Sequence, residues 1–172
     1  MSKISNVVDS LNNDVCFQTP DNKRFRLRAA AIIIEDGCVL FATNNSENYY
    51  YSIGGAIELG ETAEDAVKRE VLEETGVPYE IDRLAFVQEN FFKRNDGMLK
   101  GLECHEITFY FLMKSRGSKQ LNSHSKTLNN TIDETMEWLE IDKLEQYEAY
   151  PMFFRESLKN LKPYVEHIVT HQ

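Results

Sequence analysis

Residues 54–77 combine a glycine pair, a long helical stretch and several glutamates at fixed spacing. Glu70, Glu73 and Glu74 stand at positions i, i+3 and i+4, so on an α-helix their side chains fall within roughly 100° of one another. Three negative charges on one helical turn repel and cost stability unless a positive partner lies among them. Mg²⁺ and similar hard cations take carboxylate oxygens as ligands. The spacing therefore predicts a helix that carries a divalent metal site.

The ends of this helix are marked by residues with known capping preferences. Either Glu61 or Thr62 is placed to open the helix, and threonine is among the favoured N-cap residues. Gly76 suits the C-cap because glycine adopts the left-handed conformation without a steric penalty, and Pro78 prevents the helix from continuing. We therefore expect one helix directly after the glycine pair, ending at Gly76.

Apolar runs on both sides of the helix predict β-strands. The expected strands are residues 25–34, 38–43, 79–92, 103–114 and 137–139. The sequence Glu-Asp-Gly at 35–37 predicts a hairpin turn between the first two. Polar loops are expected at 44–48, 93–101 and 115–131. After the last strand, Asp142 is expected to cap a helix through Tyr147, and Pro151 to start a helix to about Leu161.

The length and composition of the chain suit one domain. A chain of 172 residues with 42% hydrophobic content is long enough to bury a core, and it shows no repeat, low-complexity tract or domain boundary. We expect a single domain over residues 1–172, in which residues 1–20 form a poorly defined N-terminal extension. The sequence leaves a homodimer open.

The charge balance restricts the partners of the protein. A formal net charge of −9 argues against extended binding to nucleic acids or anionic membranes, which call for basic surface. No segment resembles a signal peptide or a membrane span. Cys16, Cys38 and Cys104 are odd in number and scattered, so we interpret them as reduced thiols of a cytoplasmic protein.

The pattern from Gly55 to Val77 reads Gly-x5-Glu-x7-Arg-Glu-apolar-x-Glu-Glu-x-Gly-apolar, which resembles the Nudix box at every specified position. This resemblance implies an α/β fold, the Nudix-type α/β/α sandwich with a mixed central β-sheet. It implies hydrolysis of a nucleoside diphosphate linked to another moiety, with Mg²⁺ or Mn²⁺ as cofactor. The substrate would be a small nucleotide: a nucleotide sugar, an ADP-ribose-like compound, a dinucleoside polyphosphate or an NTP. Ile53 stands where many members have proline, and no substrate-subclass signature follows the box.

The resemblance also implies roles for the glutamates of the box. Glu70 and Glu74 correspond to direct metal ligands, and Glu73 to a further ligand or to a base that acts through a second metal ion. The backbone carbonyl of Gly54 is a further candidate ligand, at a position where a side chain would obstruct approach. A solvated acidic helix face is the alternative, which the complete spacing disfavours.

Arg69 lies outside the fan of carboxylates on a helical wheel. It is therefore expected to act as a brace that pairs with Glu61 or Glu73 and holds the loop and the helix together. Glu61 has the same structural role in the family pattern.

The general base is sought among acids outside the box. Members of the family often carry an additional acid before the late Trp-containing strand, and the matching stretch here begins at Asp133. Glu134 is the first candidate, on a flexible loop that closes over the substrate, and Asp133 is the second. Glu106 is a further candidate, and because it alternates with His105 on a strand, at most one of this pair is expected to line the pocket.

Substrate contacts are expected from aromatic faces and a few hydrogen-bond donors. Tyr51, Phe91 and Phe92 are the aromatic candidates, and Arg28 is the donor. Core packing is the alternative for each aromatic residue.

Three functions are compatible with the sequence. The leading one is a metal-dependent pyrophosphohydrolase. A non-catalytic Nudix module that senses a nucleotide metabolite is the second, but such modules usually lose box glutamates, all of which are kept here. An RNA 5′-end pyrophosphohydrolase is the third, and the acidic charge balance disfavours it.

Overall fold

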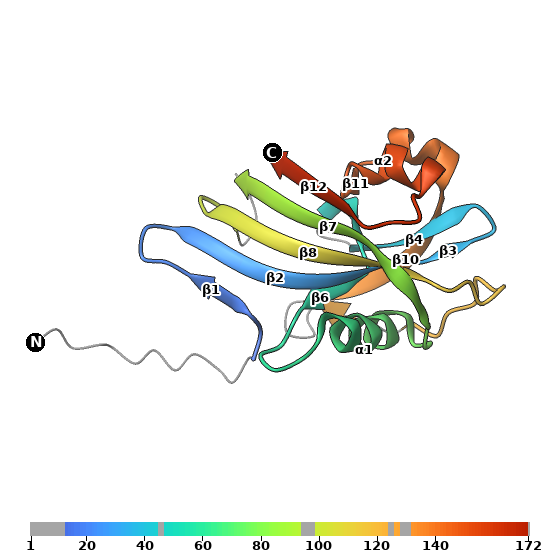
Figure 1. The fold of residues 1–172 in the computed structure, drawn as a ribbon, viewed down its shortest axis with the longest axis horizontal. Helices are drawn as coiled ribbons and strands as arrows, with labels where there is room; N and C mark the ends of the chain where they lie inside the picture. Colours follow the sequence, from blue (N-terminus) through green and yellow to red (C-terminus); the bar gives the residue numbers. More distant parts are fainter. Residues whose placement is uncertain (1–12, 45–46, 94–98, 124–125, 128–131, 172) are drawn as a thin grey trace, which may run out of the picture.

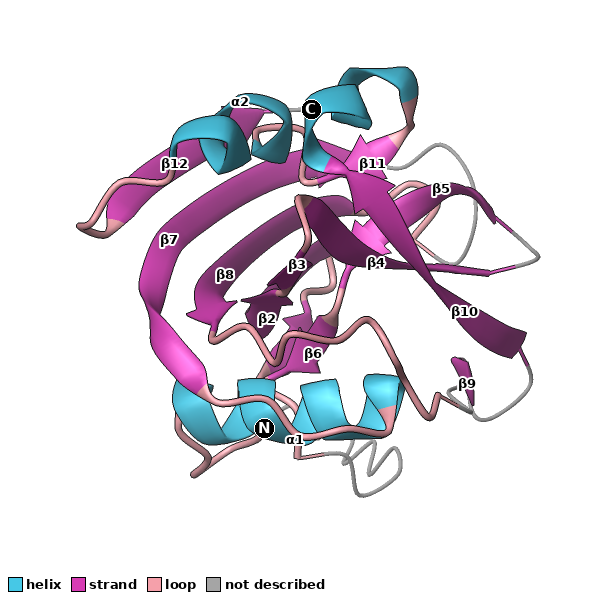
Figure 2. Cartoon of the chain, turned by 90° about the vertical axis from the view of Figure 1, so that its right-hand side faces the viewer, coloured by secondary structure: helices cyan, strands magenta, loops and turns pink. Residues whose placement is uncertain are grey.

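A computed structural model of the chain describes residues 13–44, 47–93, 99–123, 126–127 and 132–171 (Figure 1). Within these residues the strands form two six-stranded sheets. Helix α1 (Ala63–Thr75) and helix α2 (Phe154–Ser157) lie on opposite sides of the strands (Figure 2). No helix in the described ranges is long and apolar enough to span a membrane.

The first sheet is mixed. Its order is β1 (Cys16–Gln18), β2 (Lys23–Ile32), β8 (Glu103–Met113), β7 (Ile81–Lys93) and β12 (Glu166–His171), and β6 (Gly54–Ala56) also pairs with β2. The β2–β8 and β7–β12 pairs are parallel, whereas the β7–β8 pair is antiparallel. Strands β1 and β6 follow one another along the outer edge of β2, since Cys16 pairs with Arg26 and Gly54 pairs with Ala30. The glycine pair is therefore fixed to the edge of this sheet.

The second sheet brings together segments from both ends of the chain. Its order is β11 (Ala149–Tyr150), β5 (Glu47–Ser52), β4 (Cys38–Asn44), β10 (Ile132–Glu140) and β9 (Lys126–Thr127), and β3 (Ile34–Glu35) also pairs with β4. The β3–β4 hairpin confirms the predicted turn: Asp36 and Gly37 have φ angles of 47° and 72°, as its two central residues require. Strand β10 lies beside β4, which places residues near position 134 next to the start of β5.

The core explains why β2 is apolar over consecutive residues. Ala29 and Ala31 pack on α1 against Val67 and Val71, in a cluster that also contains Leu40 and Ala42 of β4. The alternate residues Ala30 and Ile32 pack on the other side, in a cluster with Phe154 of α2. Because both faces of β2 are covered, its run is continuous rather than alternating. The mixed sheet between helices confirms the predicted fold class.

A buried carboxylate holds one connection in place. Glu35 is only 2% exposed, and it accepts hydrogen bonds from Ser115 Oγ at 2.6 Å and from the backbone N–H groups of Arg116 and Gly117 at 2.6 and 3.1 Å. Burial raises the pKa of Glu35, but these hydrogen bonds outweigh burial and leave the pKa below its ordinary value. Glu35 therefore ties the segment after β8 to the β3–β4 hairpin.

The boundaries of α1 agree with the sequence. Thr62 is its N-cap and accepts a hydrogen bond from the Asp65 N–H, and Gly76 is its C-cap with a φ of 70°. Strand β10 is longer than predicted because it pairs with β4 from Glu134 to Glu140. Glu134 therefore lies in a paired strand, and its predicted place in a flexible loop is wrong.

Three further expectations need correction. The predicted Asp142 cap is wrong, because the Ile141 N–H bonds to Gly37 O and a 3₁₀-helix (η1, Ile141–Gln146) begins there. The helix predicted from Pro151 to about Leu161 is shorter in the structure, where it consists of α2 and a 3₁₀ turn (η2, Leu158–Asn160). Strands β1, β5, β6, β9, β11 and β12 were not among the expected strands, and β9 lies within the loop expected at 115–131.

Candidate active site

The glycine pair allows the backbone of β6 to approach its neighbours closely. Gly54 has a φ of 135°, and a Cβ atom there would overlap the backbone of Ala29 and Ala30. A Cβ atom on Gly55 would overlap the carboxylate of Glu70. Glycine at position 54 therefore lets β6 lie against β2, and glycine at position 55 leaves room for the Glu70 carboxylate in its present place.

Helix α1 places its three glutamates in different surroundings. The side chain of Glu70 is 16% exposed, whereas that of Glu73 is 60% exposed. Glu74 Oε1 accepts a hydrogen bond from the Gly54 N–H at 3.1 Å. Its Oε2 atom is buried and has no hydrogen-bond partner among the described residues. Glu74 thus presents an unsatisfied carboxylate oxygen beside the glycine turn.

The surroundings of Glu74 disfavour its negative charge. Burial raises the pKa of Glu74 well above its ordinary value, and the charges of Glu134 and Glu70 raise it further. Burial also raises the pKa of Glu70, against the opposing effect of Arg69. A cation placed between these carboxylates would relieve the repulsion and satisfy the orphaned oxygen.

Arg69 joins α1 to the turn that precedes it. Its Nε and Nη2 atoms donate to the two carboxylate oxygens of Glu61, at 2.9 Å each, and Nη2 also donates to Ala56 O at 3.2 Å. Its Nη1 atom donates to Glu70 Oε1 at 2.6 Å and lies 3.7 Å from Glu73 Oε2. The hydrogen bonds from Arg69 lower the pKa of Glu61. Of the two predicted partners, Glu61 is the bidentate one.

Arg28 contacts the backbone of the glycine turn from the neighbouring strand β2. Its guanidinium group donates to Ser52 Oγ at 2.9 Å, to Ser52 O at 2.7 Å and to Gly54 O at 2.9 Å, and the residue is buried. These contacts hold the backbone of the turn in place. A contact between Arg28 and substrate stays a prediction.

Glu134 is held by a tyrosine. The Tyr51 hydroxyl donates to Glu134 Oε1 at 2.6 Å, which joins β5 to β10 across β4. The negative charge of Glu134 raises the pKa of Glu74. The first candidate base therefore acts electrostatically on a glutamate of α1.

The other two candidate bases lie in different surroundings. Asp133 is exposed and, as the adjacent residue of the strand, points to the other side of β10 from Glu134. Glu106 lies 3.6 Å from Arg26 Nη1 and accepts a hydrogen bond from Thr108 at 3.3 Å. Arg26 pairs with Glu106 and Arg28 with Thr108 in the β2–β8 register, so these four side chains lie on the same side of the first sheet. They form a polar strip that leads away from the glycine turn.

Phe91 and Phe92 lie apart from the glutamates. They are adjacent in β7 and so point to opposite sides of the sheet. The Phe91 ring stacks between those of His105 and His171, with centroid distances of 4.3 and 4.9 Å. In the sheet register, His105 pairs with Phe25, three residues before Arg28, which is a separation of roughly 10 Å along the strand.

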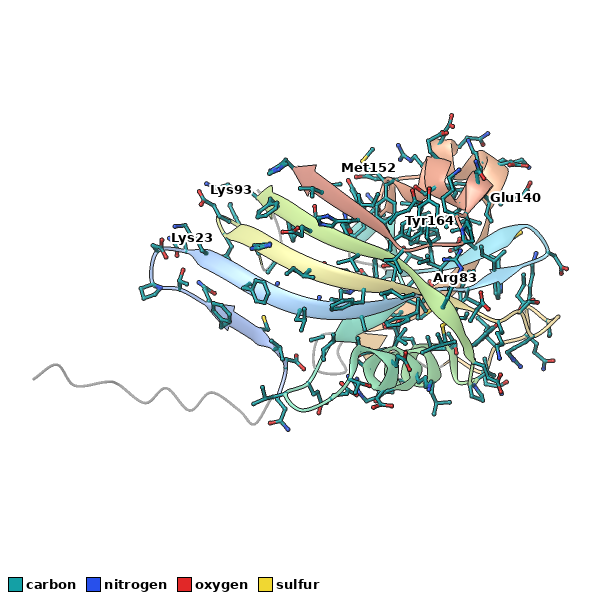
Figure 3. All side chains as sticks on the ribbon, viewed as in Figure 1. Lys23, Arg83, Lys93, Glu140, Met152 and Tyr164 are labelled. Atoms are coloured by element: carbon teal, nitrogen blue, oxygen red, sulfur yellow. The ribbon has the colours of Figure 1, made fainter. Side chains whose placement is uncertain are left out.

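Both phenylalanines line a cavity of about 660 Å³ at that end of the sheet. Lys23 and Lys93, which also line it, are labelled in Figure 3. The structure therefore does not bring Phe91 and Phe92 together with the other predicted site residues.

The predicted metal ligands do not already form one cluster. No group of three or more His, Cys, Asp or Glu side chains in the described part of the chain is arranged to hold a metal ion. Glu73 extends into solvent, and one oxygen of Glu70 is bonded to Arg69. The oxygen donors next to the glycine turn nevertheless suit a hard divalent cation, since Glu74 Oε2 has no other partner among the described residues.

Sequence reasoning missed Ser52 and gave Tyr51 a different role, that of a substrate contact. Ser52 accepts a hydrogen bond from Arg28, and Tyr51 donates one to Glu134. Both residues lie in β5, a strand that was not expected from the sequence. The available signal was the run of three tyrosines at 49–51, because aromatic residues favour strands.

Comparison with known proteins identifies the class. Residues 24–161 match the family model of the NUDIX domain, so the chain belongs to the Nudix family. As a member of this family it is a hydrolase that acts on phosphorus-containing acid anhydrides, and Nudix hydrolases generally use divalent metal ions and small-molecule nucleotide substrates.

Individual relatives agree with this assignment. A MutT-like protein of Streptomyces ambofaciens is 29% identical over 140 residues, which cover 80% of this chain and 79% of that protein. The crystal structure of a MutT protein from Methanosarcina mazei superimposes with a TM-score of 0.58 at 19% identity, covering 80% of this chain and 92% of that one. A MutT protein from Bacillus halodurans gives 0.55 at 20% identity, covering 83% and 89%. At these identities the two structures show the fold.

Proposed function

We propose that this protein is a Mg²⁺-dependent pyrophosphohydrolase that cleaves the diphosphate of a small nucleoside diphosphate derivative. The candidates are nucleotide sugars, ADP-ribose-like compounds, dinucleoside polyphosphates and NTPs, and Mn²⁺ is the alternative cofactor. The observation that carries the proposal is the buried Oε2 atom of Glu74, which has no hydrogen-bond partner among the described residues. The charges of Glu134 and Glu70 add to the effect of burial in raising the pKa of Glu74.

The metal would be held at the glycine turn. Glu74 and Glu70 would supply carboxylate oxygens and Gly54 its backbone carbonyl, which has a second lone pair beside the one that accepts from Arg28. Glu73 would turn in from solvent as a further ligand. When bound, the cation supplies charge neutralisation on the phosphate oxygens and a more acidic water.

The reaction needs a base for the attacking water, and Glu134 is the acid best placed for this role. Water oxygen bonds to phosphorus, the bridging P–O bond breaks, the leaving phosphate takes the electron pair and the water proton passes to Glu134. Arg69 and Glu61 keep the carboxylate of Glu70 in place through the contacts described above.

The substrate would extend from the turn along the polar strip of the first sheet. Arg26 is suited to bind its anionic groups, because its side chain is 28% exposed and its pairing with Glu106 is loose, at 3.6 Å. The cavity lined by Phe91 and Phe92 lies further along the same sheet. Their stacking against substrate stays a prediction, as does a homodimer.

We place the protein in the cytoplasm, which is supported by three scattered cysteines without disulfide spacing. A nucleotide-sensing module is disfavoured by the complete set of box glutamates. The alternative function, an RNA 5′-end pyrophosphohydrolase, is disfavoured by the net charge of −9.

The test is a phosphate-release screen of the purified protein with Mg²⁺ or Mn²⁺. The panel would contain ADP-ribose, nucleotide sugars, dinucleoside polyphosphates, normal and oxidised NTPs, NADH, CoA and 5′-triphosphorylated RNA. Hydrolysis of at least one small nucleotide, abolished by Glu74→Gln, is expected. Tight nucleotide binding without hydrolysis, in the presence of either Mg²⁺ or Mn²⁺, would support the sensing module instead. Hydrolysis of the RNA alone would support the RNA-directed enzyme.

A further inference from the structure

Tyr51 belongs to a chain of hydrogen bonds that spans three neighbouring strands. Asn44 Nδ2, at the end of β4, donates to the Tyr51 hydroxyl at 3.2 Å, and that hydroxyl donates to Glu134 Oε1 at 2.6 Å. Glu134 is the register partner of Asn44 in the β4–β10 ladder. All three side chains therefore project from adjacent strands to one side of the second sheet.

The direction of this chain is fixed by the chemistry of its members. A phenol has one hydrogen to donate, while the amide nitrogen of Asn44 can only donate. With Asn44 donating to the phenol oxygen, the phenol hydrogen goes to Glu134. A separation of 2.6 Å is typical of an O–H group bonded to an ionised carboxylate.

The Tyr51 ring is not placed like a stacking surface. It is partly buried against the core cluster shared by α1 and both sheets. The Tyr49 ring contacts it at a centroid distance of 6.0 Å and nearly edge-on. A ring held by the core provides a rigid anchor for the carboxylate that its hydroxyl contacts.

We propose that Tyr51 is a positioning residue that holds the Glu134 carboxylate for proton transfer from the attacking water. This role differs from the base-stacking role predicted from the sequence. The inference rests on the proposed function, in which Glu134 is the base. It explains how the carboxylate of an acid on β10 is held in one orientation by a side chain of β5.

The chain supplies a matched control. Tyr50, the preceding residue, donates to Glu137 Oε2 at 3.0 Å. This bond also joins β5 to β10, but it lies on the other side of the second sheet and is exposed. Tyr50→Phe thus removes the same kind of hydrogen bond between the same two strands, away from the glutamates of α1.

The experiment compares Tyr51→Phe with Tyr50→Phe in steady-state kinetics, on the substrate found in the screen. Phenylalanine keeps the ring and removes only the hydroxyl. We expect kcat of Tyr51→Phe to fall roughly 10- to 100-fold with KM within about twofold, because a slightly misplaced base loses most of its effect. Tyr50→Phe should keep both parameters within about twofold, and both variants should melt close to the wild-type temperature. An unchanged kcat in Tyr51→Phe, or a rise in KM alone, would overturn the inference.

A double variant separates positioning from a general effect on the fold. In a Glu134→Gln background there is no base left to position, so adding Tyr51→Phe should lower kcat by less than about twofold. A full second loss in the double variant would overturn the proposed role of Tyr51.

Failure of the inference and failure of the proposed function give different results. Wild-type turnover that Glu74→Gln abolishes, combined with normal kcat in Tyr51→Phe, rejects the role of Tyr51 and leaves the hydrolase intact. Absence of turnover in the wild type rejects both.

Discussion

Replacing Arg69 by lysine tests whether the turn before α1 and the helix itself are held together as described. The guanidinium group makes two parallel hydrogen bonds to Glu61, both at 2.9 Å, and a third to Glu70 at 2.6 Å. A lysine ammonium keeps the charge but cannot contact both oxygens of Glu61 in the same geometry while it also reaches Glu70. At least two charge-assisted hydrogen bonds are therefore lost.

The magnitude follows from those contacts. Hydrogen bonds to charged groups contribute about 1.5–3 kcal/mol each, and part of this is lost to solvent because the Arg69 side chain is 28% exposed. We expect Arg69→Lys to lower the free energy of unfolding by about 2–3 kcal/mol, which corresponds to about 4–12 °C in Tm for a domain of this size. Hydrolysis should fall together with stability, by roughly tenfold or more, because Glu70 loses its orientation.

The assay is thermal unfolding followed by circular dichroism, together with steady-state kinetics below the melting range. Arg83→Lys is the control, because the Arg83 side chain is 25% exposed but lies 3.9 Å from its ion-pair partner Asp82. This variant should change Tm by no more than about 1–2 °C. An unchanged Tm in Arg69→Lys with a higher KM would refute the brace and show that Arg69 contacts substrate.

Three other changes test separate parts of the site and the fold. Glu74→Gln should lower hydrolysis at least about 100-fold. Without metal, this variant should melt at the same temperature as the wild type or at a higher one, because a disfavoured buried charge is removed. Normal turnover in the variant would reject Glu74 as a ligand. Glu134→Gln should lower kcat roughly 10- to 1,000-fold with nearly unchanged Mg²⁺ affinity by titration, and kinetics within twofold of the parent would reject Glu134 as the base. Glu35→Gln should lower the free energy of unfolding by about 2–4 kcal/mol at neutral pH, because a carboxamide cannot accept from Ser115 and two backbone N–H groups at once. Folding lowers the pKa of Glu35, so the stability that its carboxylate contributes is fully present above the unfolded-state pKa and is lost as pH falls through the folded-state pKa. In denaturant unfolding, the free energies of unfolding of the wild type and of Glu35→Gln should therefore converge at acidic pH. A difference between them that stays constant with pH would contradict this account.

Local sequence patterns predicted the part of the candidate site that lies on α1. The part on β5 and β10 depends on long-range strand pairing. The positions of Glu70, Glu74 and Gly76 follow from spacing along one helix and its cap, which a sequence displays directly. The bond between Tyr51 and Glu134 joins residues 83 positions apart, and nothing in either segment alone specifies it. Sequence patterns place residues on elements, but strand register decides which side chains meet.

The same limit applies to the missed strands. Strand β12 reads Glu-His-Ile-Val-Thr-His, in which apolar and polar residues do not alternate, so it has no clear signal of its own. Its place is fixed by parallel pairing with β7 over six residues, from Glu166 to His171. The buried strand β2, in contrast, was predicted because consecutive apolar residues mark a strand that is covered on both faces.

The shared core of α1 and the two sheets has a consequence for how the catalytic distances are set. Glu74 is carried by α1 and Glu134 by β10, and Val71 and Ala42 lie in the single apolar cluster between these layers. The spacing of the two acids is therefore a property of interlayer packing and of neither layer alone. Interiors are packed as densely as organic crystals, so even the loss of one methylene group there is felt. Under the proposed mechanism, residues that never touch substrate set the distance between the ligand Glu74 and the base Glu134. Substitutions that loosen the packing of this cluster are therefore expected to lower turnover.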